Sequence, residues 1–321
     1  MTPSGGEEDG DDVVLVVAAE DAGTRLDALI AGKVAALSRA QAQRLIDEGC
    51  VTVGGAVVTK ANTKVKAGAE IEIEIPEPAP LELVAEDIPL AILYEDSELI
   101  AIDKPAGLVV HPAAGHASGT LVNALLFHCK DLAGIGGVLR PGIVHRLDKD
   151  TTGAMVATKT ERAHAALTAA FAQKSTGAVH REYLAIAAPP PKLAAGTLRT
   201  LYGRHPIHRK RFSSKVASGK AAVTHYQVVE KLRGAALVRL HLETGRTHQI
   251  RVHAADHGWP LVGDPVYGHR ERGELAAVAD ALGRQALHAA VLELDHPVTG
   301  VRLRFESPLP ADFQAALAAL R

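Results

Sequence analysis

Cysteine is scarce in this chain of 321 residues, and the two that occur, Cys50 and Cys129, lie far apart and outside any Cys-X-X-Cys pair. This excludes a disulfide framework and a zinc site built from cysteines. The sixteen histidines are scattered, with no His-Glu-X-X-His motif, and no phosphate-binding loop motif is present. We therefore expect no metal ion and no other cofactor.

Long apolar runs are also missing, since no stretch reaches the roughly 18 residues that a membrane-spanning helix needs. The N-terminus is acidic and polar, unlike a secretory signal peptide. We therefore expect a cytoplasmic protein with no membrane partner. Aromatic residues make up only 3 % of the chain against 47 % hydrophobic residues, so the core must be built mainly from Ala, Val, Leu and Ile.

An excess of positive charge, which nucleic-acid-binding proteins usually show, is absent because the formal net charge is −2. The charges are unevenly distributed, however. The first twelve residues contain five acids and no base, whereas residues 199–220 contain only basic charges: Arg199, Arg204, Arg209, Lys210, Arg211, Lys215 and Lys220. A nearly neutral total therefore hides a segment that could form a basic surface.

The length predicts two domains, at about 150 residues for each. Residues 1–12 are rich in glycine and acids, which predicts a disordered acidic tail. A small domain follows over residues 13–76. The proline-rich sequence that begins at Pro76 predicts a stiff linker over residues 77–88, and residues 89–321 form the larger domain.

The small domain is predicted to contain two helices, a hairpin and a strand, in that order. Apolar residues at helical spacing indicate helices over residues 25–36 and 38–49. Gly54-Gly55 lies between two short apolar runs and is a signal for a two-residue hairpin turn. Residues 70–75 alternate between glutamate and isoleucine, which is typical of a strand with one buried face.

The larger domain is predicted to be α+β with a mixed sheet, because its strands outnumber its helices and follow no regular alternation with them. Pro189-Pro190-Pro191 and Gly196 indicate a surface loop. A helix is expected over residues 161–173, and strands are expected over residues 91–93, 99–102, 154–158, 183–187, 222–229 and 237–242.

The densest group of polar residues is the sequence GIVHRLDKDTTG at residues 142–153, in which an apolar strand leads into a polar loop. Loops between rigid strands often carry catalytic groups. Asp148 lies between Arg146 and Lys149, and nearby cations favour the ionised carboxylate, so Asp148 suits the role of base or nucleophile. A turn of solvated charges explains the same residues equally well.

A second polar segment, LETGRTHQIRVH, covers residues 242–253. It predicts a short helix with Thr247 as its N-cap that ends near Gly258. His248 and Arg251 are three residues apart and therefore share a face of that helix. A helix N-terminus with these cations suits a phosphate or a carboxylate, although a solvated basic helix face is the simpler alternative.

A third segment, RHPIHRKR at residues 204–211, forms a basic loop that suits contacts with an RNA backbone. A single basic stretch is more commonly a solvated run of charges, so composition alone does not decide between these two interpretations.

Taken in order, these segments resemble the RluA-type pseudouridine synthases. The sequence HRLDKDTTG at residues 145–153 is similar to the family signature, with Thr152 in the place of the usual serine. Further similar blocks are IDKPAGLVVHP (102–112), REYLAI (181–186), LETGRTHQIRVH (242–253), LVGDPVYG (261–268) and RQALHA (284–289). The resemblance covers nearly all of residues 81–321, and the small domain resembles the S4 domain, an RNA-binding module.

The resemblance implies a pseudouridine synthase fold, with a central mixed and mostly antiparallel sheet, joined to a small α/β S4-like domain. The implied reaction isomerises uridine to pseudouridine in RNA, after the base is flipped out of its stack. Within the family, the chain looks most like the branch that acts on 23S ribosomal RNA, because of RHP at residues 204–206 and GKAAVTHY at 219–226. This resemblance implies that the target uridines lie in the helix 69 region of that RNA. The partner is RNA, in ribosomal RNA or assembling ribosomal particles, and we expect a monomer.

The resemblance also implies roles for individual residues. Asp148 acts at the ribose, Tyr183 packs against the base, and Arg251 pairs with the carboxylate of Asp148. Arg146 fills the space that the flipped base vacates, and Lys104 supports the site from below. The residues expected to bind RNA are His145, Arg146, Arg25, Arg39, Arg44, Arg204, His205, Arg209, Lys210, Arg211, Arg246 and His248.

Two other functions were weighed against this one. A non-catalytic S4-type RNA-binding or ribosome-assembly protein would explain the small domain and the basic loop, but it would not need Asp148, Tyr183 and Arg251 together. A metal-dependent hydrolase would use some of the sixteen histidines, but it predicts paired ligand spacing that the sequence lacks.

Overall fold

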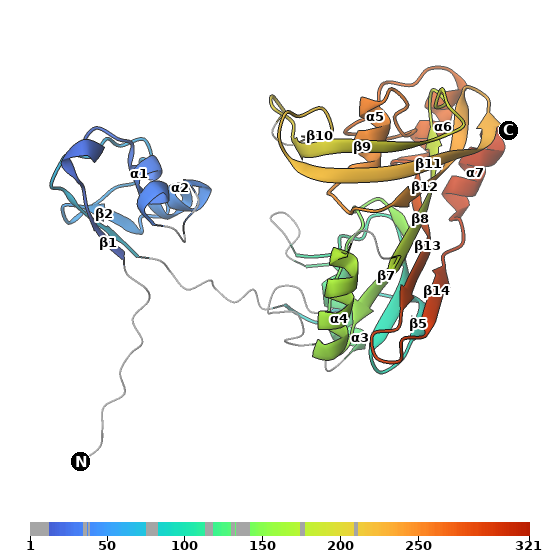
Figure 1. Cartoon of the computed structure of the whole chain (residues 1–321), viewed down its shortest axis with the longest axis horizontal. Coiled ribbons are helices and arrows are strands. Elements are labelled where there is room, and N and C mark those ends of the chain that lie inside the picture. Colours follow the sequence, from blue (N-terminus) through green and yellow to red (C-terminus); the bar gives the residue numbers. More distant parts are fainter. Residues whose placement is uncertain are drawn as a thin grey trace, which may run out of the picture. The chain divides into compact units, whose positions relative to one another are not determined.

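The computed structural model describes residues 13–34, 37, 39–74, 83–112, 118–129, 132, 142–173, 177–208 and 211–321. The predicted acidic tail, the first part of the predicted linker, and Arg209 and Lys210 lie outside these residues. The chain divides into two compact units, Met1–Pro80 and Leu81–Arg321. We call them the N-terminal unit and the C-terminal unit (Figure 1).

The N-terminal unit packs two helices against a four-stranded sheet with the order β1-β4-β2-β3. The predicted helices, hairpin and final strand are confirmed. The strand β1 was not predicted, because its sequence VVLV does not alternate and gave no periodic signal. The elements are β1 (Val13–Val16), a 3-10 turn (Ala19–Asp21), α1 (Leu26–Lys33), α2 (Arg39–Asp47), β2 (Val51–Val53), β3 (Ala56–Val57) and β4 (Glu70–Ile73).

Within the described residues, ten strands of the C-terminal unit form one sheet, with the order β10-β9-β11-β12-β8-β13-β7-β6-β5 and β14 paired to β13. The pair β13–β7 is parallel and the other pairs are antiparallel, which confirms the predicted mixed, mostly antiparallel sheet. The strands are β5 (Ala91–Glu95), β6 (Leu99–Lys104), β7 (Thr152–Thr158), β8 (Val179–Ala187), β9 (Ala195–Arg204), β10 (Phe212–Ser213), β11 (Lys220–Leu232), β12 (Ala235–Leu242), β13 (Leu287–Asp295) and β14 (Arg302–Glu306).

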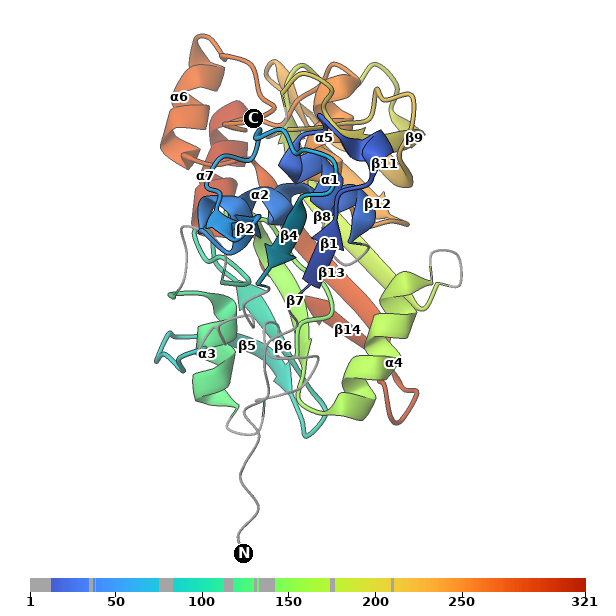
Figure 2. The ribbon, with the colours of Figure 1, turned by 90° about the vertical axis from the view of Figure 1, so that its left-hand side faces the viewer.

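Helices cover both faces of this sheet because successive side chains of a strand point to opposite faces. Met155 of β7 packs in a core cluster with α3 and α5, whereas its neighbours Ala154 and Val156 pack with α4. Figure 2 shows α3 and α4 on the two sides of β6 and β7. The helices are α3 (Leu121–His128), α4 (Glu161–Ala172), α5 (Gln249–Asp256), α6 (Glu274–Leu282) and α7 (Ala311–Leu320).

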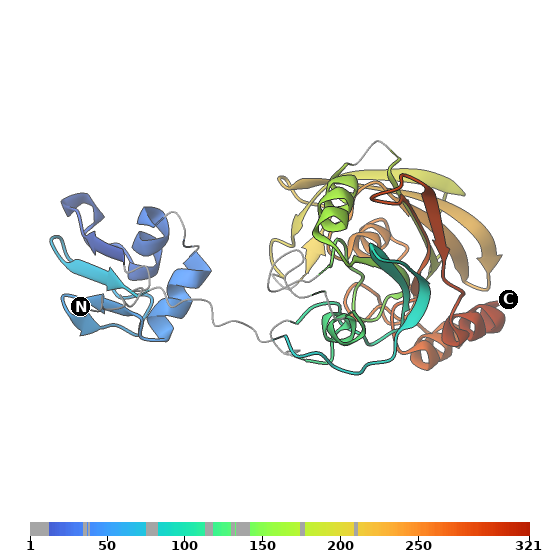
Figure 3. The ribbon, with the colours of Figure 1, turned by 90° about the horizontal axis from the view of Figure 1, so that it is seen from below.

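Helices α6 and α7 pack with β8 and β12 in a separate cluster that contains Ile186, Leu237 and Phe313. Seen from below, the strands form an arc, with α3 on the inner side and α6 and α7 on the outer side (Figure 3). The curved sheet therefore has a concave face, and the loop after residue 142 and the helix α5 both lie against it.

One expectation about this unit was wrong. Gly196 was taken as the mark of a surface loop, but it lies inside β9 and pairs with Tyr226 of β11. A side chain at Gly196 would collide with the Tyr226 ring, since a Cβ atom would lie 2.8 Å from it. The glycine is thus explained by close packing within a strand and not by a turn.

Candidate active site

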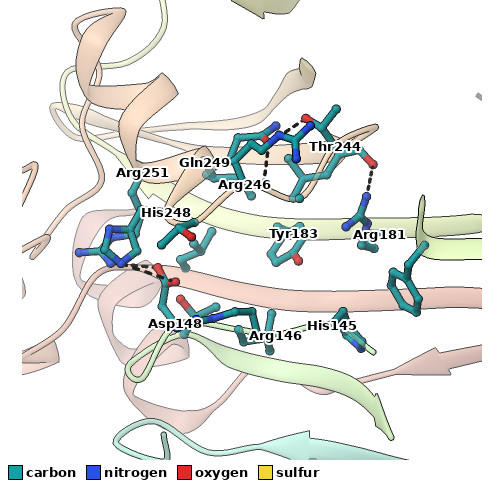
Figure 4. A pocket seen from close by; sticks show the side chains of 18 of the residues that line it. His145, Arg146, Asp148, Arg181, Tyr183, Thr244, Arg246, His248, Gln249 and Arg251 are labelled. Atoms are coloured by element: carbon teal, nitrogen blue, oxygen red, sulfur yellow. Dashed lines mark hydrogen bonds and ion pairs between the residues drawn. The ribbon is translucent and has the colours of Figure 1, made fainter. Parts of the chain in front are cut away.

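A cavity of about 520 Å³ opens where the loop at residues 142–151, the strand β8 and the turn between β12 and α5 meet. Figure 4 shows the side chains that line it. The structure brings together seven of the residues selected from the sequence, although they come from three separate segments: His145, Arg146, Asp148, Tyr183, Arg246, His248 and Arg251.

Asp148 and Arg251 form the central ion pair of this cavity. The Arg251 Nη1 atom donates to Asp148 Oδ2 at 2.9 Å, and the Asp148 side chain keeps 17 % of its surface exposed. The backbone of the aspartate loop is closed by a hydrogen bond from the Thr151 N–H to the Asp148 carbonyl, at 3.1 Å. The carboxylate is therefore held by a turn on one side and by a cation on the other, and it still faces the cavity.

Arg251 is itself fixed by Asp264, a residue that was not selected from the sequence. Its Nε and Nη2 atoms donate to the two carboxylate oxygens of Asp264, at 2.7 and 2.9 Å. Burial alone would lower the pKa of Arg251, but the hydrogen bonds and charges of Asp264 and Asp148 outweigh it and raise that pKa. The signal was available, because Asp264 belongs to the block LVGDPVYG that resembles the family.

His248 occupies the N-cap position of α5, so the predicted N-cap at Thr247 was wrong. His248 adopts the left-handed conformation, with φ at 58°, and no side chain caps the helix. Its Nε2 atom lies 3.8 Å from Asp148 Oδ1, and its Nδ1 atom lies 3.0 Å from the Tyr267 hydroxyl. Burial lowers the pKa of His248. His248 and Arg251 thus both face Asp148, as their spacing predicted.

The turn before α5 is held by Gln249, which explains why Thr247 is not needed as a cap. Gln249 Oε1 accepts from the Thr244 hydroxyl at 2.7 Å and from the Arg246 N–H at 3.0 Å. Its Nε2 atom donates to the Val223 carbonyl at 3.0 Å. The buried amide therefore ties the turn to β11 and fixes where Arg246 and His248 emerge.

The aspartate loop is also held from below by buried donors. Lys104, which is fully buried, donates from Nζ to the carbonyls of Lys149 at 2.8 Å, Pro105 at 2.8 Å and Leu108 at 2.9 Å. Burial lowers the pKa of Lys104 to about 8. The supporting role predicted for Lys104 is thus borne out by its contacts.

Two residues of the block RQALHA hold the same loop from the other side. Arg284 donates to the Asp150 carbonyl at 3.2 Å, and Gln285 donates to the Thr151 hydroxyl at 3.1 Å. Neither residue was selected from the sequence, because side chains that bind a backbone carbonyl leave no spacing pattern. Their membership of a resembling block was the available signal.

Tyr183 and Arg146 complete the cavity beside Asp148. Tyr183 projects from β8 with 7 % of its surface exposed, and burial raises the pKa of its hydroxyl. Arg146 is exposed on the aspartate loop and borders the same cavity. A ring wall and a cation therefore flank the carboxylate, an arrangement that suits a planar base with an attached phosphate.

His145 is placed differently from the RNA contact expected of it. Its Nε2 atom accepts from the Val156 N–H at 3.0 Å, and its ring stacks on Phe171 with the centroids 4.5 Å apart. Burial lowers the pKa of His145 to about 3, so the ring is neutral. These contacts favour a packing role, in which His145 fixes the loop that carries Arg146.

The described part of the basic segment, residues 204–208 and 211, does not line the cavity. Arg204, His205 and Arg211 lie where β9 turns into β10, and the Arg204 guanidinium lies over the Phe212 ring at 4.4 Å. Phe212 in turn contacts the His248 ring edge to face, with the centroids 6.0 Å apart. The segment is therefore connected to the site through an aromatic contact.

Two of the three arginines expected to bind RNA in the N-terminal unit share one buried acid. Arg25 and Arg39 each donate to Asp27, at 3.0 and 3.1 Å, and both keep about half of their side chains exposed. Arg44 is more exposed and lies 3.8 Å from Glu48. The Asp27 cluster therefore orders two of these arginines without removing them from the surface.

One group of described residues could offer three atoms to a metal ion: Glu95, His128 and Cys129. The ammonium of Lys159 already pairs with Glu95 at 2.7 Å, and a cation in that position opposes a metal. Among the described helices, none has the length and apolar character required to cross a membrane.

Comparisons with known proteins agree with these observations. A family model described as RNA pseudouridylate synthase matches residues 98–256, and one described as S4 domain matches residues 24–71. The chain is 48 % identical over 305 residues to ribosomal large subunit pseudouridine synthase D of Pseudomonas aeruginosa, covering 93 % of this chain and 92 % of that protein. It is also 48 % identical over 301 residues to an uncharacterized RNA pseudouridine synthase of Synechocystis, covering 93 % and 90 %.

Solved structures show the same fold. Human RNA pseudouridylate synthase domain containing 4 is similar with a TM-score of 0.56 and 28 % identity, covering 72 % of this chain and 92 % of that one. Human RNA pseudouridylate synthase domain containing 1 gives the same TM-score of 0.56 at 23 % identity, covering 75 % and 90 %.

Proposed function

The chain belongs to the RNA pseudouridine synthase family and is an RNA pseudouridine synthase, and from this premise we propose that its substrate is large-subunit ribosomal RNA. The support is the similarity to relatives named ribosomal large subunit pseudouridine synthase D, at 45 to 48 % identity in Pseudomonas aeruginosa and Zymomonas mobilis. Family membership removes the alternative of a non-catalytic RNA-binding or assembly protein.

Asp148 is the catalytic carboxylate of this proposal. The observation that carries it is the pair with Arg251, in which one carboxylate oxygen is bound at 2.9 Å while the other faces the cavity, 3.8 Å from the nearest histidine nitrogen. Arg251 cannot turn away because Asp264 holds its other nitrogens. A fixed, ionised carboxylate beside the ribose stabilises positive charge at C1′ as the base departs.

In the reaction, the bond between N1 of uracil and C1′ breaks, the base rotates, and a bond between C5 and C1′ forms. The proton on C5 then leaves and N1 gains a proton, so that uridine and pseudouridine have the same composition and charge. Asp148 acts either by attack on C1′, forming an ester bond that breaks when C5 bonds to C1′, or by removal of the proton on C2′, which returns to C2′ when C5 bonds to C1′. Tyr183 packs against the base and assists the final proton transfer.

The target uridine must leave its stack before Asp148 can reach the sugar, which costs a few kcal/mol. Arg146 fills the vacated space, since a planar guanidinium can stack on bases and bind phosphate. The helix 69 region of 23S ribosomal RNA is the target that the sequence resemblance implies. The S4-like unit adds RNA affinity, and the enzyme acts as a cytoplasmic monomer.

The test is release of tritium from C5-labelled uridine in large-subunit ribosomal RNA, followed by sequencing of the product. Wild-type protein releases tritium, and Asp148→Asn lowers the rate by about 10³-fold or more, since a positioned carboxylate of this kind contributes roughly 10²–10⁴-fold. Asp280→Asn, which changes an exposed acid on α6, is the matched control and keeps the wild-type rate.

Release by both wild type and Asp148→Asn would overturn the role of Asp148. No release from ribosomal RNA, with release from transfer RNA, would overturn the proposed substrate and leave the enzyme class intact.

A further inference from the structure

A second cavity, of about 640 Å³, adjoins the first. Both volumes fall within the range of about 300–1,000 Å³ that is usual for ligand sites. The two cavities share four lining residues: Phe171, Arg181, Leu242 and Glu243. The two cavities therefore meet at the ends of β8 and β12, with Arg181 in the lining of both.

Arg181 occupies the point at which two strands separate. The pairing of β8 with β12 runs as far as Glu182 and His241 and then stops. Beyond it, Arg181 Nη2 donates to the carbonyls of Leu242 at 3.3 Å and Glu243 at 3.4 Å, two residues that no longer pair with β8. These bonds are long for a charged donor. In Figure 4 Arg181 and Arg251 lie toward opposite ends of the pocket, with Tyr183 between them.

The Arg181 guanidinium forms no ion pair with a carboxylate of the described residues. The three nearby acids already have arginine partners: Glu243 pairs with Arg199, Glu182 with Arg239, and Glu293 with Arg302 and Arg304. The Nε atom of Arg181 is buried and has no hydrogen-bond partner, and burial lowers the pKa of this arginine. A half-buried cation in this state is missing an anion, which a ligand could supply.

The second cavity also presents flat rings. His180 and His241 stack with centroids 4.4 Å apart and planes 16° apart, and His225 continues the row at 5.7 Å and 22° from His241. His241 is therefore covered on both faces, and His180 is the end ring of the row that lines the cavity and can take a base on its outer face. Stacking of bases on such rings is tolerant of sequence.

We propose that the second cavity receives the nucleotide adjacent to the target uridine, and that Arg181 binds the phosphate joining the two nucleotides. The proposal rests on the proposed function, because it takes the target uridine to occupy the first cavity. Arg181 supplies the charge, and His180 at the end of the histidine row supplies the stacking surface. The absence of a side chain at Gly245 leaves room for the guanidinium, since a Cβ there would lie 2.7 Å from its Nη1 atom.

The experiment is a scan of neutral linkages in an RNA fragment that the wild-type enzyme modifies. A methylphosphonate replaces one phosphate at a time around the target uridine, and dissociation constants are measured for wild type and Arg181→Gln. We expect the methylphosphonate at one linkage next to the uridine to raise the dissociation constant of the wild-type complex about tenfold. Arg181→Gln binds the all-phosphate RNA about tenfold more weakly and is insensitive to that same linkage, while its salt dependence falls by about one phosphate contact.

Arg233→Gln is the matched control, because Arg233 is an exposed arginine at the far end of the β11–β12 hairpin that pairs with Glu274. It keeps the wild-type response to every linkage. Arg181→Lys, which keeps a charge, recovers part of the linkage sensitivity. The proposal is overturned if wild type responds to no linkage beside the uridine, or if Arg181→Gln still responds to all of them.

The proposed ribosomal substrate can fail separately. If wild type modifies transfer RNA only, the same scan on transfer RNA still decides the role of Arg181.

Discussion

Two arginines of the cavity, the buried Arg251 and the half-buried Arg181, have opposite surroundings. Arg251 donates to two carboxylates, and only 6 % of its side chain is exposed. Arg181 donates only to two carbonyls through long bonds, and its Nε atom is unsatisfied. The positive charge of Arg251 is therefore neutralised by carboxylates of the protein at one end of the cavity, whereas that of Arg181 has no carboxylate at the other end.

This difference indicates two different roles. Arg251, which is held by its own carboxylate partners, is a positioning residue that keeps Asp148 in one orientation. An arginine without an acid is expensive to keep buried, so its retention is explained by an anion that comes from outside the protein. The predictions below test this contrast, beginning with the largest expected effect.

Asp264→Asn should break the buried ion pair between Asp264 and Arg251. Removing one partner of a buried ion pair usually lowers the free energy of unfolding by about 3–5 kcal/mol, and Asp264 is fully enclosed in its pair with Arg251. Urea denaturation of the variant measures the loss, with Asp280→Asn as the control that stays within about 0.5 kcal/mol of wild type. If Asp264→Asn lowered the free energy of unfolding by less than 1 kcal/mol, Arg251 would not depend on its carboxylate partner and would not differ from Arg181 in this respect.

Lys104 is a third buried cation and gives an independent measure of the cost of charge without an acid. Its folded-state pKa of about 8 lies below its ordinary value of 10.5, so the unfolded chain binds more protons between these values and stability rises with pH across that window. The full difference corresponds to about 3 kcal/mol. Unfolding free energies of wild type should therefore rise relative to Lys104→Met between pH 8 and pH 10, and parallel curves would refute the assignment.

Arg181→Gln should separate binding from stability. Removing a cation that has no acid changes the free energy of unfolding by less than about 1 kcal/mol, whereas the tenfold loss of RNA affinity corresponds to about 1.4 kcal/mol. Thermal or urea denaturation beside RNA titration measures both quantities on one preparation. A stability loss as large as that of Asp264→Asn would show that Arg181 is a structural residue.

Gly245→Ala should have the smallest effect on stability. The added Cβ meets only the end of the Arg181 side chain, which is flexible and can shift. We expect less than about 1 kcal/mol of destabilisation together with a loss of RNA affinity of a few-fold. The double variant with Arg181→Gln should bind RNA no more weakly than Arg181→Gln alone, and additive losses would mean that Gly245 acts through another group.

Local patterns predicted the elements that repeat a simple period. The strand β4 was found because Ile71 and Ile73 alternate with glutamates, and both isoleucines are fully buried. The strand β1 and the interior strand position of Gly196 were missed, because pairing with a distant strand decides them and leaves no local period. Seven described elements of the C-terminal unit were likewise not assigned: α3, β9, β10, α6, β13, β14 and α7.

The site divides in the same way. Asp148, His248 and Arg251 could be selected because charged residues cluster in two short segments. Asp264 and Arg181 were not given roles, because the role of each depends on which charged group the fold brings opposite it. A carboxylate opposite Arg251, and the lack of one opposite Arg181, are properties of the folded chain.

The large sequence separation between Asp148 and Arg251 also has a consequence for the synthesis of the protein. Arg251 is added 103 residues after Asp148, which at about 5–20 residues per second takes roughly 5–20 s on the ribosome. Gln285, which holds the aspartate loop through Thr151, comes later still, 134 residues after its partner. A nascent chain therefore contains Asp148 long before it contains the residues that hold it, and from the role proposed for Asp148 we expect chains that stop before residue 251 to be inert however well their first strands have folded.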